Sequence, residues 1–422
     1  MTAQIVVLNQ RGASVASDSL VTFGRSDTLR TMNAADKMFD AGPGHSVAVL
    51  HSGAAQFMQI HFEVLIAQWR RSLGDPLPTL SDYATSYCSW LVEQKHLFGG
   101  EPQDAMFTWL LDDVYLSIHR ELRRRLTGDS LYDEPWDTID VKAAVNSVVT
   151  ARAETLAGGD MLPGIDVDAT AEWVLERTDR ISASFDWIFN DVPRTEAADR
   201  ILLEEIPLLV VTRAVPWEVD ATVVFVGYGA HDTFPSYTSV IITGIINDTL
   251  MVRPFIDAQM TAQSRGIITT FGQDEAVQTF IRAYNYDFLS AAHKRLDSVL
   301  DDLLDSDTVT PAEDAGDTED DAGADSEEPK SRSAYHQELD DDFTNVSWEG
   351  FVKPMLDTVS VLSPSDMLRM AESLIGIQAL RAATSTGLPS VGGPIDLALI
   401  TRNEGVQWVR RKDHLTDFQR DW

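Results

Sequence analysis

The chain has 422 residues, of which 44% are hydrophobic, and its 66 acidic and 33 basic side chains give a formal net charge of −33. This charge argues against a nucleic-acid partner, because phosphate backbones bind basic surfaces. No run reaches the roughly 18 apolar residues of a membrane span and no leader pattern opens the chain, so we expect a cytoplasmic protein without membrane contact. Cys88 is the single cysteine, so no disulfide can form within the chain.

Two β-hairpins are predicted at the start of the chain. Residues 2–20 hold a β-branched apolar run, a polar turn and a return strand, and residues 37–51 repeat this pattern around a Gly-Pro-Gly turn. Amphipathic helices are then predicted over residues 54–73 and 80–96.

The rest of the chain mixes helical and strand patterns. Residues 99–215 carry an apolar period of three to four and are predicted to be mostly helical. The later patterns predict strands at 221–229, 239–248 and 249–255, helices at 274–304, 348–358 and 364–384, and a closing strand pair at 395–402 and 404–411. Hairpins imply antiparallel pairing, so we expect an α+β fold with two sheets and helices outside them.

An acidic segment interrupts the second half of the chain. Between residues 301 and 342 there are 17 Asp and Glu against two bases, Lys330 and Arg332. Such a segment buries too little apolar surface to offset its ordering entropy, so we predict a disordered insertion over residues 301–345. It is either a solvated spacer or a docking segment for a basic partner.

Three residues near the start suggest a nucleophilic site. If Met1 is removed, Thr2 carries both a hydroxyl and a free α-amine, whose ordinary pKa of about 7.7–8.0 suits it to act as a base for that hydroxyl. A nearby lysine cation would keep the amine neutral, and a carboxylate would hold that lysine in place. Asp18, on the return strand, and Lys37, at the start of the next hairpin, are the candidates.

In this order and spacing, the three residues resemble the active site of proteasome β-subunits and their bacterial relative HslV, which are N-terminal-nucleophile (Ntn) hydrolases. The acid lies 16 positions after the nucleophile (18 − 2), and the lysine opens a Lys-hydrophobic-Phe strand, here Lys37-Met38-Phe39. Further stretches resemble the family in the same order along the chain: residues 47–69, 223–229 and 392–409. The resemblance covers roughly residues 2–98, 219–295 and 362–410. It implies a four-layer αββα sandwich and a homo-oligomeric ring.

The resemblance divides the chain into five expected parts. They are the N-terminal part of the sandwich (2–98), a helical insertion (99–218), the central part (219–300), the acidic insertion (301–345) and the C-terminal part (346–422).

The chain departs from the family pattern around the expected amine. The family's Gly-Ser-Gly-Ser turn is replaced by Phe271-Gly272-Gln273-Asp274. In the later Arg-Asp-x-x-Ser-Gly segment, Leu388 replaces the acid and Val391 the serine, and Ser390 is a possible supporting residue. Where the second hairpin ends and the next helix is expected to start, the backbone amides of His51, Ser52 and Gly53 are candidates for an oxyanion hole.

These residues predict a threonine hydrolase that cleaves peptide bonds in a peptide or unfolded protein. The alternatives are an inactive scaffold or assembly protein and a small-molecule amidase. We expect no cofactor and no metal, because the histidines show no ligand spacing such as His-Glu-x-x-His.

Overall fold

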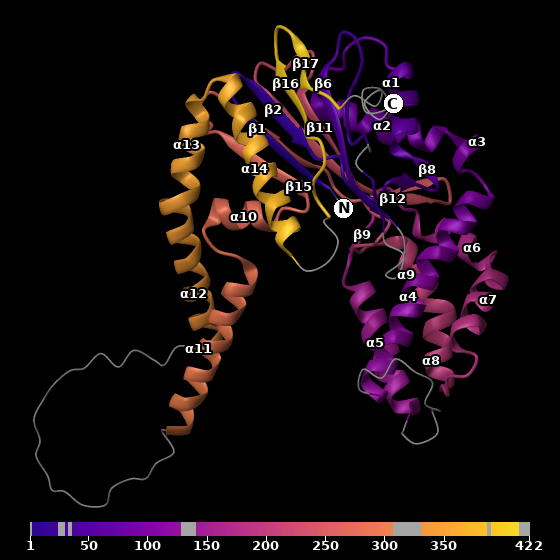
Figure 1. The fold of residues 1–422 in the computed structure, drawn as a ribbon. Helices are drawn as coiled ribbons and strands as arrows, with labels where there is room; N and C mark the ends of the chain where they lie inside the picture. The colour runs from indigo at the N-terminus through magenta and orange to yellow at the C-terminus, as the bar shows by residue number, and fades with distance from the viewer. Residues whose placement is uncertain are drawn as a thin grey trace, which may run out of the picture.

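The computed structural model describes residues 2–23, 30–32, 36–127, 141–306, 331–385 and 390–412. Two antiparallel sheets form its centre (Figure 1). The first sheet has the order β15 (Ile267–Gly272), β1 (Ala3–Asn9), β2 (Gly12–Ser17), β16 (Asp396–Thr401), β17 (Gly405–Arg410). The second has the order β13 (Thr249–Val252), β12 (Ser236–Ile246), β11 (Ala221–Tyr228), β6 (Ser46–Gly53), β5 (Met38–Asp40), and β14 (Ile256–Gln259) also pairs with β12.

The two sheets face each other through a shared apolar layer. Val6 and Val15 of the first sheet belong to the same buried cluster as Leu50 and Val224 of the second. Successive strand residues point to opposite faces, so the neighbours of Val6, such as Ile5, pack outward instead. Strand β1 is therefore buried on both faces, which explains its continuous apolar run.

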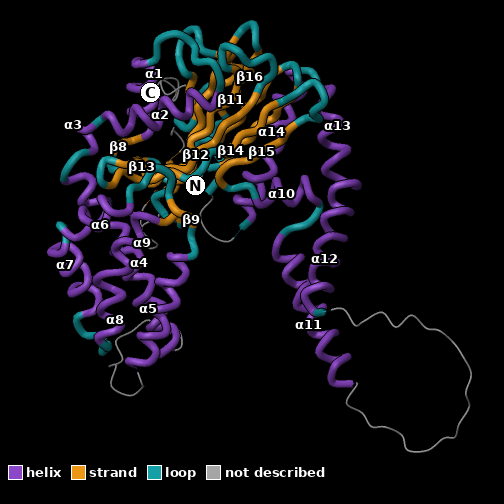
Figure 2. The backbone as a smooth tube through the Cα atoms, turned by 180° about the vertical axis from the view of Figure 1, so that it is seen from behind, coloured by secondary structure: helices purple, strands orange, loops and turns teal. Residues whose placement is uncertain are grey.

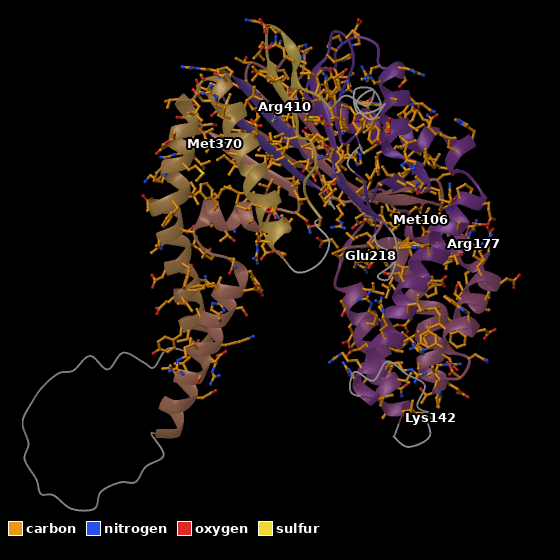
Figure 3. The ribbon with its side chains drawn as sticks, in the orientation of Figure 1. Met106, Lys142, Arg177, Glu218, Met370 and Arg410 are labelled. Atoms are coloured by element: carbon orange, nitrogen blue, oxygen red, sulfur yellow. The ribbon has the colours of Figure 1, made fainter. Side chains whose placement is uncertain are left out.

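Helices cover the outer face of each sheet. Helices α1 (Phe62–Ser72) and α2 (Leu80–Glu93) pack on the second sheet, and α10 (Glu275–Arg282), α13 (Lys353–Val361) and α14 (Pro364–Thr384) pack on the first. Arg410, at the end of β17 (labelled in Figure 3), pairs with Glu372 of α14 at 2.6 Å. The predicted α+β class with antiparallel pairing is confirmed.

Two helical groups project from this centre, as both views show (Figures 1 and 2). One has its own buried core and consists of α4 (Glu101–Thr127), α5 (Val141–Ala157), α6 (Val167–Leu175), α7 (Thr178–Phe189), α8 (Glu196–Arg200), the π-helical turn η2 (Ile201–Glu205) and α9 (Ile206–Thr212). The other is the pair α11 (Tyr286–Ser306) and α12 (Arg332–Ser347), followed by the π-helical turn η3 (Trp348–Val352). The remaining short elements are α3 (Lys95–Phe98) and the strand pairs β3 (Val21–Phe23) with β4 (Arg30–Met32), β7 (Gln56–Phe57) with β8 (Ile60–His61), and β9 (Asp160–Met161) with β10 (Arg213–Ala214).

Three predicted boundaries are wrong. The helix predicted from residue 54 begins at Phe62, because the β7–β8 hairpin occupies the preceding residues. The helix predicted over 274–304 is split, because Ala283 adopts a left-handed φ of 64° that ends α10. The strand predicted over 249–255 ends at Val252.

Part of the predicted disordered insertion is helical. Residues 332–345 lie in α12 and residues 301–306 end α11, whereas 307–330 lie outside the described residues. The two helices are joined by reciprocal contacts, since His293 bonds to Asp340 and His336 to Asp297, each at 2.9 Å. Acidic side chains in α11 and α12 are thus partnered by histidines, which a charge count does not reveal.

Candidate active site

The three predicted site residues lie at neighbouring strand ends. Antiparallel pairing of β1 with β2 sets Gln4 opposite Ser17, so Thr2 and Asp18 lie at the same end of these two central strands. Lys37 comes just before β5 in the second sheet. All three are buried, with Thr2 5%, Asp18 0% and Lys37 2% exposed.

Lys37 and Asp18 form a buried ion pair. The Lys37 Nζ lies 2.8 Å from Asp18 Oδ1 and also donates to the Leu20 carbonyl at 2.6 Å. Asp18 Oδ1 accepts the Ala3 N–H at 3.0 Å, and Oδ2 accepts the Gly392 N–H at 3.2 Å. The carboxylate thus holds Lys37 and the residue after Thr2 at once.

Burial lowers the pKa of Lys37 below its ordinary value, and the nearby Lys412 adds to this effect, while Asp18 opposes both. An ammonium group held this close to the chain start would in turn disfavour protonation of an amine on Thr2.

The backbone of Thr2 is clasped by the turn after β15. The Gln273 N–H donates to the Thr2 carbonyl at 2.6 Å, and Gly272 pairs with Ala3. A Cβ on Gly272 would lie 2.0 Å from that carbonyl oxygen, and Gly272 has a left-handed φ of +79°. Only glycine fits here, so Gly272, which stands where the Gly-Ser-Gly-Ser turn has its first serine, is required for a structural reason.

Ser390 lies next to this turn. Its hydroxyl donates to Gln273 Oε1 at 2.5 Å, so it supports the residue that holds the Thr2 carbonyl. Val391 is buried, and Leu388 lies outside the described residues.

Gln4 is a central polar residue that our sequence reasoning missed. Its amide nitrogen donates to the carbonyls of His51 (2.9 Å) and Lys37 (3.1 Å) and lies 3.3 Å from the Ser17 hydroxyl. It therefore ties the first sheet to the Lys37 segment of the second. The available signal was a glutamine beside a β-branched apolar run.

A second buried ion cluster, which the sequence also did not reveal, involves Asp36, the residue before Lys37. The Lys412 Nζ is 3.1 Å from both Asp36 Oδ1 and Asp396 Oδ2, and its backbone N–H donates to Asp396 Oδ1 at 2.7 Å. Lys412 is 5% exposed. This lysine links the C-terminal end of the described chain to Asp36, the residue before Lys37, and so helps to hold the Lys37 segment in place.

The predicted oxyanion residues have a different setting from the one expected. His51, Ser52 and Gly53 are the last residues of β6, opposite Val223, Thr222 and Ala221 of β11, and no helix starts there. The His51 N–H donates to the Lys37 carbonyl at 3.1 Å. That amide already has an acceptor, which argues against His51 as an oxyanion donor, and the amides of all three residues stay predictions.

The His51 side chain is buried beside Lys37. Its ring stacks between Phe39 and Phe62, with centroid distances of 6.1 and 5.1 Å, and Nε2 bonds to the Asp36 carbonyl at 3.2 Å. Burial lowers its pKa to about 4, and the cations Lys37 and Lys412 contribute to the shift.

This shift predicts acid sensitivity. Between about pH 6.5 and about pH 4 the unfolded chain binds a proton at His51 that the folded chain does not, so the free energy of unfolding should fall as pH is lowered through this window. The His51 share is on the order of 3 kcal/mol. Urea unfolding at stepped pH should show a shallower fall in His51→Phe, and equal slopes would contradict the assignment.

Within the described ranges, no group of three or more His, Cys, Asp or Glu is arranged to hold a metal ion. None of the described helices is both long and apolar enough to cross a bilayer. Burial raises the pKa of Cys88 to about 12, which leaves its thiol protonated and unsuited to nucleophilic attack.

The chain was compared with family models, with curated proteins and with solved structures. No family model and no curated protein matches the chain. Among solved structures, the chain is similar to the Anbu (Gly-1) mutant from Hyphomicrobium sp. strain MC1, with a TM-score of 0.28 and 9% identity, over 100% of this chain and 96% of that one. A TM-score this low carries no argument about shared fold or function.

The predicted membership of the proteasome β-subunit and HslV family is therefore wrong. No family model supports it, and the similar structure named above is too distant to replace that support. The expected ring depended on the same resemblance. The structure itself shows Thr2 next to the buried ion pair of Lys37 and Asp18, in an α+β fold with antiparallel sheets.

Proposed function

We propose that the chain hydrolyses amide bonds, with Thr2 as nucleophile once the residue before it is removed. The observation that carries the proposal is the Asp18 carboxylate, which binds Lys37 Nζ at 2.8 Å and the Ala3 N–H at 3.0 Å. One acid therefore fixes an ammonium group and the peptide bond that follows Thr2. The two sheets and the helices on their outer faces would then form a four-layer αββα sandwich that holds the site. Residues 99–218 would be an insertion in it.

The chemistry follows from these positions. Thr2 Oγ1 attacks the substrate carbonyl while the Thr2 α-amine takes the hydroxyl proton, and the amine then gives that proton to the leaving nitrogen as the C–N bond breaks. Water, deprotonated by the same amine, cleaves the resulting ester and restores Thr2. Lys37 keeps the amine neutral, and Asp18 orients Lys37. The amides of Ser52 and Gly53 are the candidate donors to the oxyanion.

Turnover of peptide amides by Thr2 variants tests this proposal. With intact mass confirming that Thr2 is the first residue, wild type should release the amine product. Thr2→Ala should lose at least about 10³-fold in kcat, and Thr2→Ser should keep measurable turnover because it retains a hydroxyl. Equal rates in wild type and Thr2→Ala would reject the nucleophile. No turnover in any of the proteins would favour the scaffold role.

A further inference from the structure

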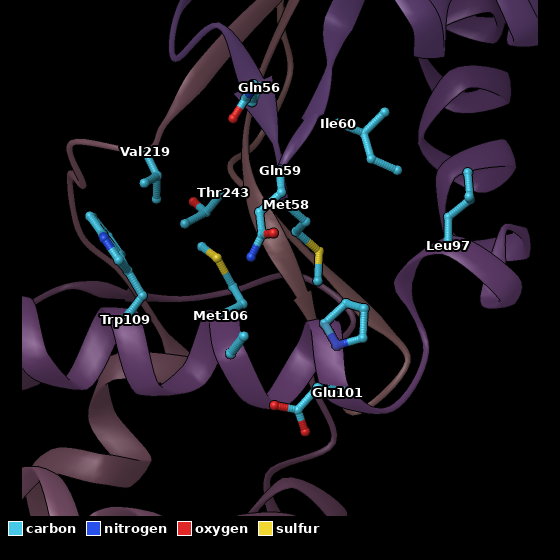
Figure 4. A pocket seen from close by; sticks show the side chains of 12 residues that line it. Gln56, Met58, Gln59, Ile60, Leu97, Glu101, Met106, Trp109, Val219 and Thr243 are labelled. Carbon is cyan, nitrogen blue, oxygen red and sulfur yellow. The ribbon is translucent and has the colours of Figure 1, made fainter. Parts of the chain in front are cut away.

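A cavity of about 700 Å³ lies where the helical group α4–α9 meets the second sheet (Figure 4). Helix α4 contributes Met106 and Trp109, the β7–β8 hairpin contributes Met58 and Gln59, and strand β12 contributes Thr243. Met106 lies at the end of the helical group nearest the sheets (Figure 3). The volume falls within the range of small-ligand sites, roughly 300–1,000 Å³.

The cavity is graded from an apolar interior to a polar rim. Met106 and Thr243 are buried at its floor, and half-buried apolar side chains form its walls. Two polar atoms of the lining already have partners, since the Thr243 hydroxyl donates to Asp220 at 2.7 Å and Met58 Sδ accepts the Ile245 N–H at 3.2 Å. An occupant of the interior would therefore bury apolar surface and make few hydrogen bonds.

The rim sets the charge that the cavity accepts. Its exposed lining residues are Gln56, Gln59 and Glu101, and Glu101 is the one charged side chain among the residues that line it. Glu101 is partnered by Arg180 at 2.7 Å. A carboxylate-bearing occupant would gain no cation here, so neutral apolar groups are favoured.

The hairpin wall is held in a costly conformation. Met58 and Gln59 both have positive φ, of 45° and 71°, at the turn where Asn-Gly is usually found. Such residues are strained and persist only where the surroundings hold them. The Met58 contact with Ile245 is one such restraint, and it keeps the methionine at the cavity.

The cavity is within reach of the Lys37 site. Gln56 follows His51 by five residues, so their Cα atoms are at most about 18 Å apart, and the His51 N–H bonds to the Lys37 carbonyl. About five residues of an extended peptide would span this distance.

We infer that this cavity binds an apolar, uncharged side chain of a peptide and so selects which peptides reach Thr2. The inference rests on the proposed function only in treating the peptide as a substrate, since binding needs no turnover. Met106 and Trp109 belong to the helical group α4–α9. This group would therefore determine which peptides the Thr2 site accepts.

Binding can be measured on the full chain carrying Thr2→Ala, with methionine methyl groups labelled with ¹³C. Leucine substitutions at Met58 and Met106 assign their two signals. N-acetylphenylalaninamide should shift both signals saturably and give contacts between its ring protons and the two methyl groups. N-acetylaspartamide should do neither.

A variant whose cavity is filled by a larger side chain is compared with a variant of the same kind at a distant position. Ala105→Trp should weaken the phenylalanine-amide shifts at least about tenfold, whereas Ala291→Trp, on the exposed face of α11, should leave them unchanged. Ring contacts to other methionines, or none at all, would overturn the inference even if Ala105→Trp fails to fold. Binding with no turnover in wild type would instead reject the proposed hydrolysis and leave the cavity assignment standing.

Discussion

Replacing Lys37 by methionine is expected to lower the free energy of unfolding by about 3–5 kcal/mol and to abolish turnover. The substitution leaves Asp18 as a fully buried carboxylate that retains two backbone N–H donors but has lost its cation. Breaking one side of a buried pair costs this much because the remaining charge is uncompensated. Urea unfolding and peptide-amide hydrolysis measure the two effects.

A double variant and a surface control separate the causes. Lys37→Met with Asp18→Asn should recover part of the lost stability, because no buried charge is left, but should stay inactive because the cation is still missing. Lys353→Met removes an exposed pair with Glu349, at 2.6 Å, and should cost under about 1 kcal/mol. Equal losses at Lys37 and Lys353 would show that the buried pair has no special weight.

Gly272→Ala should be the second most damaging change, through geometry rather than charge. The added Cβ would lie 2.0 Å from the Thr2 carbonyl oxygen, a backbone atom that can move only if Thr2 moves. We expect a loss of at least about 2 kcal/mol beyond the cost of a left-handed alanine, together with loss of turnover, measured by urea unfolding and hydrolysis.

Gly164→Ala is the matched control for that substitution. Gly164 has nearly the same φ, +75°, but a Cβ there would meet nothing within 4 Å. It should therefore show only the conformational cost of about 1–2 kcal/mol, with turnover unchanged. If the two alanine variants behave alike, the turn at Gly272 does not position Thr2.

The parts of the site that lie close together in the sequence were predictable. Hairpin patterns placed Thr2 and Asp18 at adjacent strand ends, and Lys37 before the next strand, because period-two alternation and turn residues act locally. Gln4 was missed because one polar residue beside an apolar run gives no hint of three acceptors on two sheets.

Long-range and tertiary effects explain the remaining failures. Lys412 meets Asp36 from the far end of the chain, and local pattern does not encode that contact. The β7–β8 turn was hidden because Met58 and Gln59 are not typical turn residues and are held by tertiary contacts. Helix α12 was missed because its acidic face is partnered by histidine pairs with α11. Short collinear motifs likewise suggested a family that the comparisons do not support.

The most direct measurement is the site of covalent labelling by a β-lactone, read by intact mass and peptide mapping. We predict one adduct on Thr2 of the natural protein, with the preceding residue absent, and no adduct in Thr2→Ala or in folded Lys37→Met/Asp18→Asn. A natural protein that retains the residue before Thr2, or labelling that persists without Thr2, would contradict a nucleophile at this position.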